Sequence, residues 1–426
     1  MKPYYQVALI DTVPVDARNL GSVNLGLKIA ARKLGADTYH WRDSIPHGYD
    51  TLAYNVFYPM HILNMLVSIK ANHRGEKVIA GGQGVSNING LLTGIVDEIY
   101  KGEIDGDAQD GHGWNRQDCL DSPPEFSGNK AVIELTRGCK YRCTFCEYGS
   151  VTGGKYREKD IGLVKEQIDT CVGQGIRHIN FLSANLSGYR MLDELMEYCS
   201  YRFIRILNSD MCLTDIDKIM PWLDRFKMRN IKLGLESFDE QTRHSVKKNI
   251  TDSRLDSIID ELLITCNYLH FYLIYGLPQD NYDSWYSWLD RLAEKRLYYT
   301  AKTPHMFDGV VNVNTKNVRF EFSITNFEPV PGTPLHYAPE IDFVDKAMFL
   351  QGWFSKLKDT AFYQPWAEPD YKNTGGRIGR RENSYKMLMS LKTGRVPNLQ
   401  AASHKVFPRG VGRSIDDDKA LRWLSY

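Results

Sequence analysis

The chain has 426 residues, of which 42% are hydrophobic and 25% are charged, a composition that excludes a disordered or collagenous protein. Its 53 basic and 52 acidic residues give a net charge of +1, so total charge points to neither nucleic acid nor a membrane surface. The eight cysteines are too sparse for a disulfide scaffold at this length, which predicts roughly two or three domains.

The sequence contains no candidate membrane span. Its first apolar run, Val7 to Ile10, stops at Asp11, and no later run approaches the roughly 18 uncharged apolar residues that a spanning helix needs. We therefore expect a cytoplasmic protein with reduced thiols and no membrane partner.

Strand-like and helix-like patterns alternate over the first quarter of the chain. This alternation is typical of an α/β fold with an open parallel sheet. We expect a doubly wound parallel sheet over residues 1–105, with its ligand site at the carboxyl ends of the strands. The expected strands are 4–10, 36–41, 51–57, 77–80 and 96–100, and the expected helices are 24–34 and 62–71.

A linker and a second alternation follow. Residues 106–130 are rich in acidic residues, glycine and proline, which predicts a linker. Residues 131–336 contain six strand–helix units, which predict an incomplete parallel barrel with functional loops after its strands. The expected strands are 131–136, 177–182, 202–208, 229–235, 269–275 and 318–324, and the expected helices are 160–174, 190–200, 214–226, 239–248, 253–266 and 281–296.

The C-terminal extension, residues 337–426, is basic. Residues 372–413 hold ten Lys or Arg against one acid, Glu382, a local net charge of +9. This pattern suits phosphate contacts with a nucleic acid or another polyanion. The alternatives are a solvated tail or basic arms that pair with the acidic linker. The preceding aromatic residues suit core packing or a substrate pocket, and they are Trp353, Phe354, Phe362, Tyr363, Trp366 and Tyr371.

Three cysteines form a motif directly after the first barrel strand. Cys139, Cys143 and Cys146 have the spacing C-x3-C-x2-C. Soft thiolates select zinc, copper(I) or iron–sulfur clusters, and a structural zinc site would need a fourth ligand. Three thiolates on a 4Fe–4S cluster leave one iron open for a substrate, which is a catalytic arrangement. A zinc site and three unrelated thiols remain as alternatives.

With Phe145 as its aromatic position, this motif resembles the signature of the radical S-adenosylmethionine (SAM) enzymes. The resemblance covers about 131–336 and implies a partial (β/α)6 barrel in which the three cysteines hold a 4Fe–4S cluster. It implies that the open iron binds SAM, and that an electron cleaves SAM to methionine and a 5′-deoxyadenosyl radical. That radical abstracts a hydrogen atom from the substrate, and a reductant such as flavodoxin or ferredoxin supplies the electron.

The same resemblance implies SAM contacts after the later strands. Ser183 and Asn185 follow the second strand, where the family's Gly-Gly-Glu-like motif is degenerate in this chain. Asn208 ends the third strand and is expected either to contact SAM or to cap the next helix. Besides Phe145, the implied contacts are Glu236 and Ser237 near the ribose and carboxylate, and Tyr275 and Gly276 near the adenine.

Residues 1–105 resemble the cobalamin-binding-type domain that precedes the barrel in one subgroup of this family. The Gly81-Gly82 pair and the turn at Gly102-Glu103 match its motifs. No Asp-x-His-x-x-Gly element is present, so a histidine-ligated cobalamin is not expected. No cysteine precedes Cys119, unlike the related methylthiotransferases, whose N-terminal domain supplies three cysteines to a second cluster. The domain is expected either to bind cobalamin without a protein ligand or to act as a lid without it.

Five cysteines lie outside the motif. Cys171, Cys199 and Cys266 occur in apolar helical patterns and are expected in the core, while Cys119 shows no ligand spacing. Cys212 follows the third strand, on the expected catalytic side. It is either a hydrogen donor to a substrate radical or an ordinary loop thiol.

These observations predict a radical SAM enzyme. Methyl transfer to an unactivated carbon would need cobalamin, whereas hydrogen abstraction followed by rearrangement, insertion or another modification would not. A nucleic acid or a nucleotide-bearing molecule is the substrate class that the basic segment suggests. The competing hypothesis is a non-catalytic iron–sulfur or zinc protein that uses the cysteines for structure or electron transfer.

Overall fold

The structure is a computed structural model, and it describes residues 6–13, 25–57, 61–86, 92–103, 120, 122–146, 148–149, 156–301, 304–307, 310–313, 318–327, 329, 333–339, 349, 352–353 and 356. These residues belong to two compact units, which divide between Cys119 and Leu120. Cys119, the basic segment 372–413 and most of the aromatic residues expected before it lie outside the described residues. No helix in the described part of the chain is long and apolar enough to cross a membrane.

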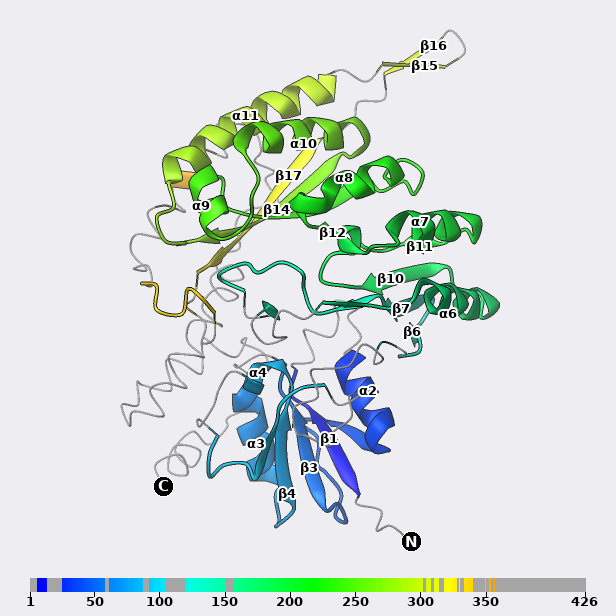
Figure 1. Cartoon of the computed structure of the whole chain (residues 1–426), viewed down its shortest axis with the longest axis vertical. Coiled ribbons are helices and arrows are strands. Elements are labelled where there is room, and N and C mark those ends of the chain that lie inside the picture. Colours follow the sequence, from blue (N-terminus) through cyan, green and yellow to red (C-terminus); the bar gives the residue numbers. More distant parts are fainter. Residues whose placement is uncertain are drawn as a thin grey trace. The chain divides into compact units, whose positions relative to one another are not determined.

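The first unit is a five-stranded parallel sheet in the order β2-β1-β3-β4-β5. Strand β1 pairs with β2 on one side and with β3 on the other, so the strand order reverses direction at β1. Helices α2 and α3 cover opposite faces of the sheet (Figure 1). This is the doubly wound order expected from the sequence. Its elements are β1 (Val7–Asp11), α2 (Leu25–Leu34), β2 (Asp37–His40), β3 (Thr51–Asn55), α3 (Ile62–Asn72), β4 (Lys77–Gly81), α4 (Gln83–Ser86) and β5 (Glu98–Tyr100).

The glycine pair at the end of β4 makes a turn that no other residue fits. Gly82 has φ +100°, and a Cβ there would lie 2.6 Å from the Val56 carbonyl oxygen. Glycine is required both for this left-handed conformation and for the close approach of the two backbones. The turn expected at Gly81-Gly82 is therefore present.

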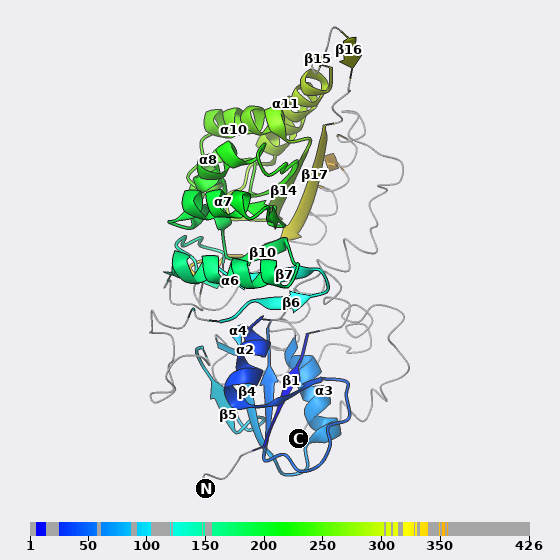
Figure 2. The same ribbon diagram turned by 90° about the vertical axis from the view of Figure 1, so that its right-hand side faces the viewer.

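The second unit contains two four-stranded sheets, ordered β11-β10-β7-β6 and β12-β13-β14-β17. Every pairing within them is parallel except that of β6 with β7, and the helices lie along one side of the strands (Figures 1 and 2). The expected α/β fold class is confirmed. The strands are β6 (Glu125–Ser127), β7 (Lys130–Glu134), β8 (Thr136–Arg137), β9 (Arg157–Glu158), β10 (His178–Leu182), β11 (Arg205–Ile206), β12 (Asp210–Met211), β13 (Asn230–Glu236), β14 (Tyr268–Tyr275), β15 (Pro304–Phe307), β16 (Val310–Val313) and β17 (Arg319–Asn326).

The helices of the second unit follow the strands in alternation. The one expected over 214–226 is broken into short pieces, and the other five are present close to their expected bounds. The helical segments of the second unit are α6 (Ile161–Gly173), η3 (Leu186–Gly188), α7 (Leu192–Tyr201), η4 (Leu213–Asp215), α8 (Ile216–Ile219), η5 (Met220–Trp222), α9 (Glu240–Ser245), α10 (Asp252–Thr265) and α11 (Tyr282–Ala301).

The third barrel strand is split into β11 and β12, where the sequence predicts one strand over 202–208. At the break, the Asn208 side chain accepts a hydrogen bond from the Phe181 backbone nitrogen and donates one to the Phe181 carbonyl, each at 2.8 Å. The amide thus makes the two bonds that a backbone residue would make in a ladder. The expectation that Asn208 caps the next helix is wrong, because the N-cap residues there are Cys212 and Asp215.

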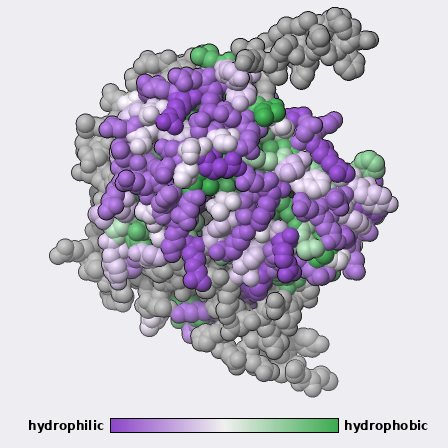
Figure 3. Space-filling view, turned by 45° about the horizontal axis from the view of Figure 1, so that its top comes forward, coloured by the Kyte–Doolittle hydropathy of each residue, from purple (hydrophilic) through white to green (hydrophobic). Residues whose placement is uncertain are grey.

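A large apolar core lies between the barrel strands and the helices of the second unit. Cys171, Cys199 and Cys266 are fully buried in it, as expected. Trp353 stacks on Phe238, so core packing is confirmed for this member of the aromatic stretch. On the face seen in Figure 3, hydrophilic residues predominate and apolar ones are scattered, which is ordinary for a protein surface.

Candidate functional site

The side chains expected at the site come from loops at one end of the barrel strands. Because the strands are parallel, their carboxyl ends share one rim, and the chain leaves that rim in loops before each helix. The cysteine motif follows β7, Ser183 and Asn185 follow β10, and Cys212 follows β12. Glu236 ends β13 and Tyr275 ends β14. The fold therefore gathers residues that are far apart in the sequence.

The three motif thiols are half-buried on the loop after β7. The Cys146 backbone nitrogen donates to the Cys143 carbonyl at 3.1 Å, which closes a tight turn between two of them. Burial raises the pKa of Cys139 to about 11 and that of Cys143 to about 12, although the Lys248 ammonium acts to lower both. Thiols in such a setting become thiolates when a metal centre binds them.

The number of these thiols bears on the kind of metal centre. Three soft thiolates fall one short of the four protein ligands that a structural zinc takes. On a 4Fe–4S cluster the same three would leave one iron open. The donor set of three thiols therefore fits an iron–sulfur cluster better than a structural zinc.

Phe145 packs against a small apolar cluster. It contacts a group formed by Val246, Leu277 and Phe327, which lie after α9, β14 and β17. The Thr144 carbonyl also accepts a hydrogen bond from Leu335 N at 3.3 Å. The aromatic position of the motif thus anchors the cysteine loop to three other loops of the rim.

Ser183 and Asn185 differ in how far the protein satisfies them. The Ser183 hydroxyl oxygen is buried and has no hydrogen-bond partner among the described residues, whereas both ends of the Asn185 amide are bonded. The Asn185 oxygen accepts from Ser187 at 2.7 Å and from the Cys212 backbone nitrogen at 3.3 Å. A buried unpaired hydroxyl is costly unless a ligand or water satisfies it, so Ser183 fits a cofactor contact. Asn185 instead ties two loops together.

Glu236 and Lys248 form a buried ion pair at the end of β13. Glu236 Oε1 lies 3.1 Å from Lys248 Nζ, and both side chains are nearly buried. Glu236 has φ +69°, at a bulge in the pairing of β13 with β14. A Cβ on Gly234 would lie 3.1 Å from the carboxylate and 3.3 Å from the ammonium, so glycine gives the pair its space.

Lys248 also places a positive charge near the thiols. Burial alone would lower the pKa of Lys248, but Glu236, Cys212 and Cys143 together raise it above its usual range. The ammonium stays charged, and it lies within electrostatic reach of two cysteines. A cation here can offset the negative charge of a thiolate-bound cluster or bind a carboxylate.

Ser237 supports its own loop. It is fully buried; its hydroxyl donates to Asp280 at 2.6 Å and accepts from the Asp239 backbone nitrogen at 2.8 Å and Trp285 Nε1 at 3.1 Å. Burial raises the pKa of Asp280 to about 6, despite the hydrogen bonds from Ser237 and Trp285.

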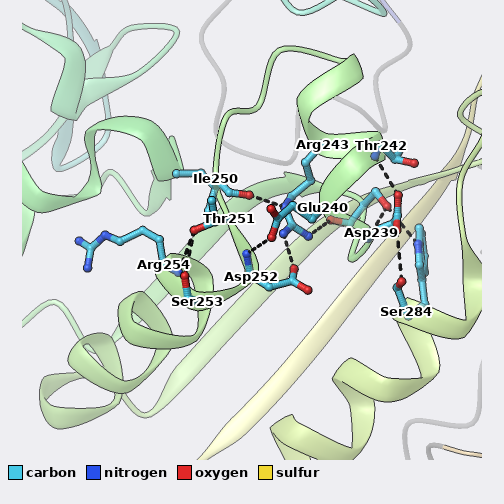
Figure 4. Close-up of polar contacts among 12 residues, drawn as sticks. Asp239, Glu240, Thr242, Arg243, Ile250, Thr251, Asp252, Ser253, Arg254 and Ser284 are labelled. Carbon is cyan, nitrogen blue, oxygen red and sulfur yellow. Dashed lines mark hydrogen bonds and ion pairs between the residues drawn. The ribbon is translucent and has the colours of Figure 1, made fainter.

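A buried arginine braces this loop from behind (Figure 4). Arg243 is fully buried and donates to the carbonyls of Ile250 at 3.0 Å and Ser237 at 3.2 Å. Its third bond is an ion pair with Asp252 at 2.5 Å. Because a guanidinium has five donors in a rigid fork, it fixes three chain segments at once.

The loop after β14 begins with aromatic stacking. Tyr275 is buried and stacks on the rings of Tyr282 and Phe349, with centroids 4.8 and 4.6 Å away, and those two rings also contact each other. Gly276 has φ +93°, and its backbone nitrogen donates to the Tyr282 hydroxyl at 3.2 Å. Gly276 therefore redirects the chain at the rim, while the Tyr275 ring belongs to the packing beneath it.

Cys212 lies near the motif. The Cys212 backbone nitrogen donates to Asn185 Oδ1 at 3.3 Å, and the Asn185 amide nitrogen in turn donates to the Tyr141 hydroxyl of the cysteine motif at 3.4 Å. The Cys212 thiol is half-buried. Its position on the rim agrees with the catalytic side expected from the sequence. Its role as a hydrogen donor stays a prediction.

Three residues of this region were missed by the sequence patterns: Lys248, Asp215 and Asp280. Lys248 belongs to a Lys-Lys pair in a polar stretch that is typical of an exposed surface. One feature of the sequence favours it: Lys248 follows the Glu236-Ser237 motif closely in the chain, and a buried carboxylate such as Glu236 needs a positively charged partner.

The family comparison agrees with this geometry. Residues 133–292 match the model of the radical SAM superfamily. This part of the chain belongs to that superfamily. The family resemblance stated from the sequence is confirmed, and radical SAM proteins use a 4Fe–4S cluster and SAM.

Curated relatives match the radical SAM domain only in part. A tRNA-2-methylthio-N(6)-dimethylallyladenosine synthase of Psychrobacter arcticus is 30% identical over 96 residues, which are 22% of this chain and 19% of that protein. A bacteriochlorophyllide d C-8(2)-methyltransferase of Chlorobaculum tepidum is 27% identical over 124 residues, covering 22% and 27%. The match thus spans about a fifth to a quarter of each relative's length.

Two solved structures share the fold over most of the chain. The methyltransferase TsrM from Kitasatospora setae, with tryptophan and a SAM analogue bound, has a TM-score of 0.54 and 12% identity, covering 78% of this chain and 75% of its own. The cobalamin-dependent enzyme OxsB, with aqua-cobalamin bound, has a TM-score of 0.52 and 12% identity, covering 94% and 70%. At this identity the likeness establishes the fold alone.

A buried side-chain amide at the carboxyl end of the first sheet is a candidate ligand contact. Asn55 ends β3, beside the end of β1, and its Nδ2 is buried with no hydrogen-bond partner in the part of the chain that the structure describes. Its backbone oxygen accepts from the Thr12 hydroxyl at 2.7 Å. Neighbouring strands that connect in opposite directions create a crevice at this edge, where α/β sheets bind ligands. An orphaned amide donor there fits a ligand rich in hydrogen-bond acceptors.

Proposed function

We propose that the chain is a radical SAM enzyme in which Cys139, Cys143 and Cys146 hold a 4Fe–4S cluster. The observation that best supports this proposal is the position of the three thiols on the barrel rim, near the buried Glu236–Lys248 ion pair. When bound, the cluster and SAM supply reductive cleavage of SAM and a 5′-deoxyadenosyl radical that abstracts a substrate hydrogen. A reductant such as flavodoxin or ferredoxin is the proposed electron source.

The chain's own residues position and shield this chemistry. Lys248 offers a charged ammonium that stays protonated at neutral pH, and Ser183 offers a hydroxyl whose oxygen has no partner among the residues described by the structure. The Phe145 cluster excludes water beneath the cysteine loop. Arg243 and Ser237 hold the loop after β13 in place, which supports the Glu236 side chain at the bulge.

The test is SAM cleavage by anaerobically reconstituted protein. With dithionite as electron donor, we expect 5′-deoxyadenosine and methionine in the wild type and none in a variant with Cys139, Cys143 and Cys146 all changed to Ala. Cys171→Ala is the matched control, because it removes a cysteine in the core far along α6. An iron-loaded wild type that forms no 5′-deoxyadenosine under strong reductant would favour the non-catalytic alternative.

We further propose that the first unit binds cobalamin and that the reaction is a methylation. The orphaned Asn55 amide and the doubly wound sheet support a ligand at that edge, and two proteins of like fold are described as cobalamin-dependent or cobalamin-bound. A lid without cobalamin, and hydrogen abstraction without methyl transfer, are what a negative result would indicate.

A polyanionic substrate is proposed from the charge of 372–413. A tRNA-modifying enzyme among the partial relatives is in keeping with this idea. If the segment binds nucleic acid, affinity for RNA should fall steeply as salt is raised from about 50 to about 200 mM, because each phosphate contact releases counterions. Absence of RNA and DNA binding even at low salt, in a gel-shift assay, would reject it.

A further inference from the structure

Asp215 is a buried carboxylate that receives four donors. Lys140 Nζ lies 2.7 Å from its Oδ2, Asn185 Nδ2 donates to the same oxygen at 3.1 Å, and the Tyr141 hydroxyl donates to it as well. Lys218 Nζ lies 3.1 Å from Oδ1. Asp215 is only 9% exposed, and hydrogen bonds to a buried charge are the strong kind.

Two of these donors belong to the cysteine motif. Lys140 and Tyr141 are the first two of the three residues between Cys139 and Cys143. Lys140 also donates to the Gly188 carbonyl at 3.4 Å. A single carboxylate on the loop after β12 thereby holds the segment that joins two proposed cluster ligands.

The contacts leave little freedom around the carboxylate. A Cβ on Gly188 would lie 3.0 Å from Asn185 Nδ2, 3.2 Å from Lys140 Cε and 3.4 Å from Asp215 Oδ2. The other end of the Asn185 amide accepts from the Cys212 backbone nitrogen. The loops after β7, β10 and β12 are thus joined through one network, which we call the Asp215 latch: Lys140, Tyr141, Asn185 and Asp215.

We propose that Asp215 is a positioning residue that fixes the Cys139–Cys143 turn before any cluster binds. The identity of what the thiols hold rests on the proposed function, but the order of the turn does not. Without the latch, Lys140 and Tyr141 lose their buried partner, and the turn opens more often. The two thiols then sample arrangements in which they cannot bind one cluster together.

The test uses metal-free protein and measures the turn directly. In Asp215→Asn, which keeps the shape and removes the charge, Cys139 and Cys143 should be alkylated by iodoacetamide about tenfold faster than in wild type, read residue by residue by mass spectrometry. Hydrogen exchange of peptides over 138–146 should rise, while exchange in α7 should not. Asp217→Asn is the matched control, because Asp217 pairs with Arg254 on the surface two residues away.

A second set of variants keeps the carboxylate, in case Asp215→Asn does not fold. Lys140→Met and Tyr141→Phe should each accelerate alkylation of Cys139 and Cys143. In the double variant Lys140→Met/Asp215→Asn, the alkylation rate should rise by less than the product of the two single effects, because both changes break the same contact. After reconstitution, the iron content and the cluster's midpoint potential should change in Asp215→Asn and stay at wild-type values in Asp217→Asn.

Thiol labelling of folded Asp215→Asn at the wild-type rate would overturn the proposal, as would equal effects in Asp215→Asn and Asp217→Asn. Because labelling and exchange are read without metal, failure of SAM cleavage in the wild type would leave this test intact. A protein that cleaves SAM normally but shows no change of the turn in Asp215→Asn would reject the latch and keep the proposed function.

Discussion

A buried ion pair depends on both of its partners. Glu236 and Lys248 are nearly buried and 3.1 Å apart, and the Lys248 ammonium also donates to the Gly234 carbonyl at 3.2 Å. Removing one partner leaves the other charge in a poorly solvated place, which is usually worse than never having had the pair. The pair is therefore a sensitive point of the proposed cofactor site.

Lys248→Met should destabilise the protein and weaken SAM binding. The expected loss is roughly 3 kcal/mol of unfolding free energy, because Glu236 is left without its counter-ion. Urea unfolding of metal-free protein measures it, and calorimetry with reconstituted protein measures SAM affinity. Lys247→Met is the matched control at an exposed neighbour, and equal behaviour of the two variants would show that the pair has no special role.

Asp280 offers a test by pH. Its carboxyl group has a pKa raised by burial from 3.8 to about 6, so in the folded state it holds a proton that the unfolded chain releases. The stability it contributes is present below about pH 4 and is lost as pH rises through 6.

Asp280→Asn should cancel this dependence. Relative to the variant, the wild type should lose about 2 kcal/mol of unfolding free energy between about pH 4 and pH 8, since a tenfold difference in proton affinity between the folded and unfolded chain is worth about 1.4 kcal/mol. Urea unfolding of both proteins across this range, followed by circular dichroism, gives the difference. Parallel curves for the two proteins would contradict the raised pKa.

At the scale of elements, the loop between β13 and α10 is held by one side chain. Arg243 lies on α9 and bonds the Ser237 carbonyl before it, and the Ile250 carbonyl and Asp252 after it (Figure 4). The short helix α9 thus carries the brace for a loop on each side. An arginine fork makes this possible where a single ammonium does not.

Arg243→Lys should lower the unfolding free energy by about 2 kcal/mol and also reduce SAM cleavage, because the Ser237 carbonyl loses its donor. Thermal unfolding and 5′-deoxyadenosine formation are the two measurements. Arg254→Lys provides the comparison, since Arg254 forms partly exposed surface pairs with Asp217 and Glu261. A larger effect at Arg254 would argue against the brace.

The order of strands and helices followed from periodicity, and the cysteine loop followed from spacing. Short continuous apolar runs such as those of β1 and β7 are recognisable because a parallel strand can be buried on both faces. The split of the third strand at Asn208 was not predicted. A side chain that takes the place of backbone pairing does not change the hydrophobic pattern of the sequence. Likewise, the satisfied amide of Asn185 and the buried hydroxyl of Ser237 depend on partners contributed by other strands.

At the scale of the whole molecule, the two units each present an edge of parallel strands with unsatisfied polar groups. Asn55 Nδ2 in the first unit and Ser183 Oγ in the second are both buried, and neither has a hydrogen-bond partner within the described ranges. Such atoms are rare in folded proteins unless a ligand or water meets them. Among the buried polar atoms of the described residues, these two lie at strand ends where a bound molecule would supply the missing hydrogen bond.

For the first unit we expect about one hydroxocobalamin per chain after anaerobic incubation, read by visible absorbance after desalting. Asn55→Ala should weaken binding about tenfold, because it removes a buried donor at the ligand edge. Asn72→Ala is a comparison at a buried asparagine whose amide is fully used within the unit. Cobalamin retention that is unchanged in Asn55→Ala, or absent in the wild type, would contradict the assignment.

The short strand β6 has a consequence for solubility during folding. Three residues, Glu125–Ser127, pair antiparallel with β7 and cover the side of that strand away from β10. An uncovered β7 would present a row of free amides and carbonyls on a strongly apolar strand, which is a template for pairing with another chain. Because β6 has only three residues, the edge that it leaves exposed is short, which limits such pairing. It comes from the stretch for which the sequence predicted a linker.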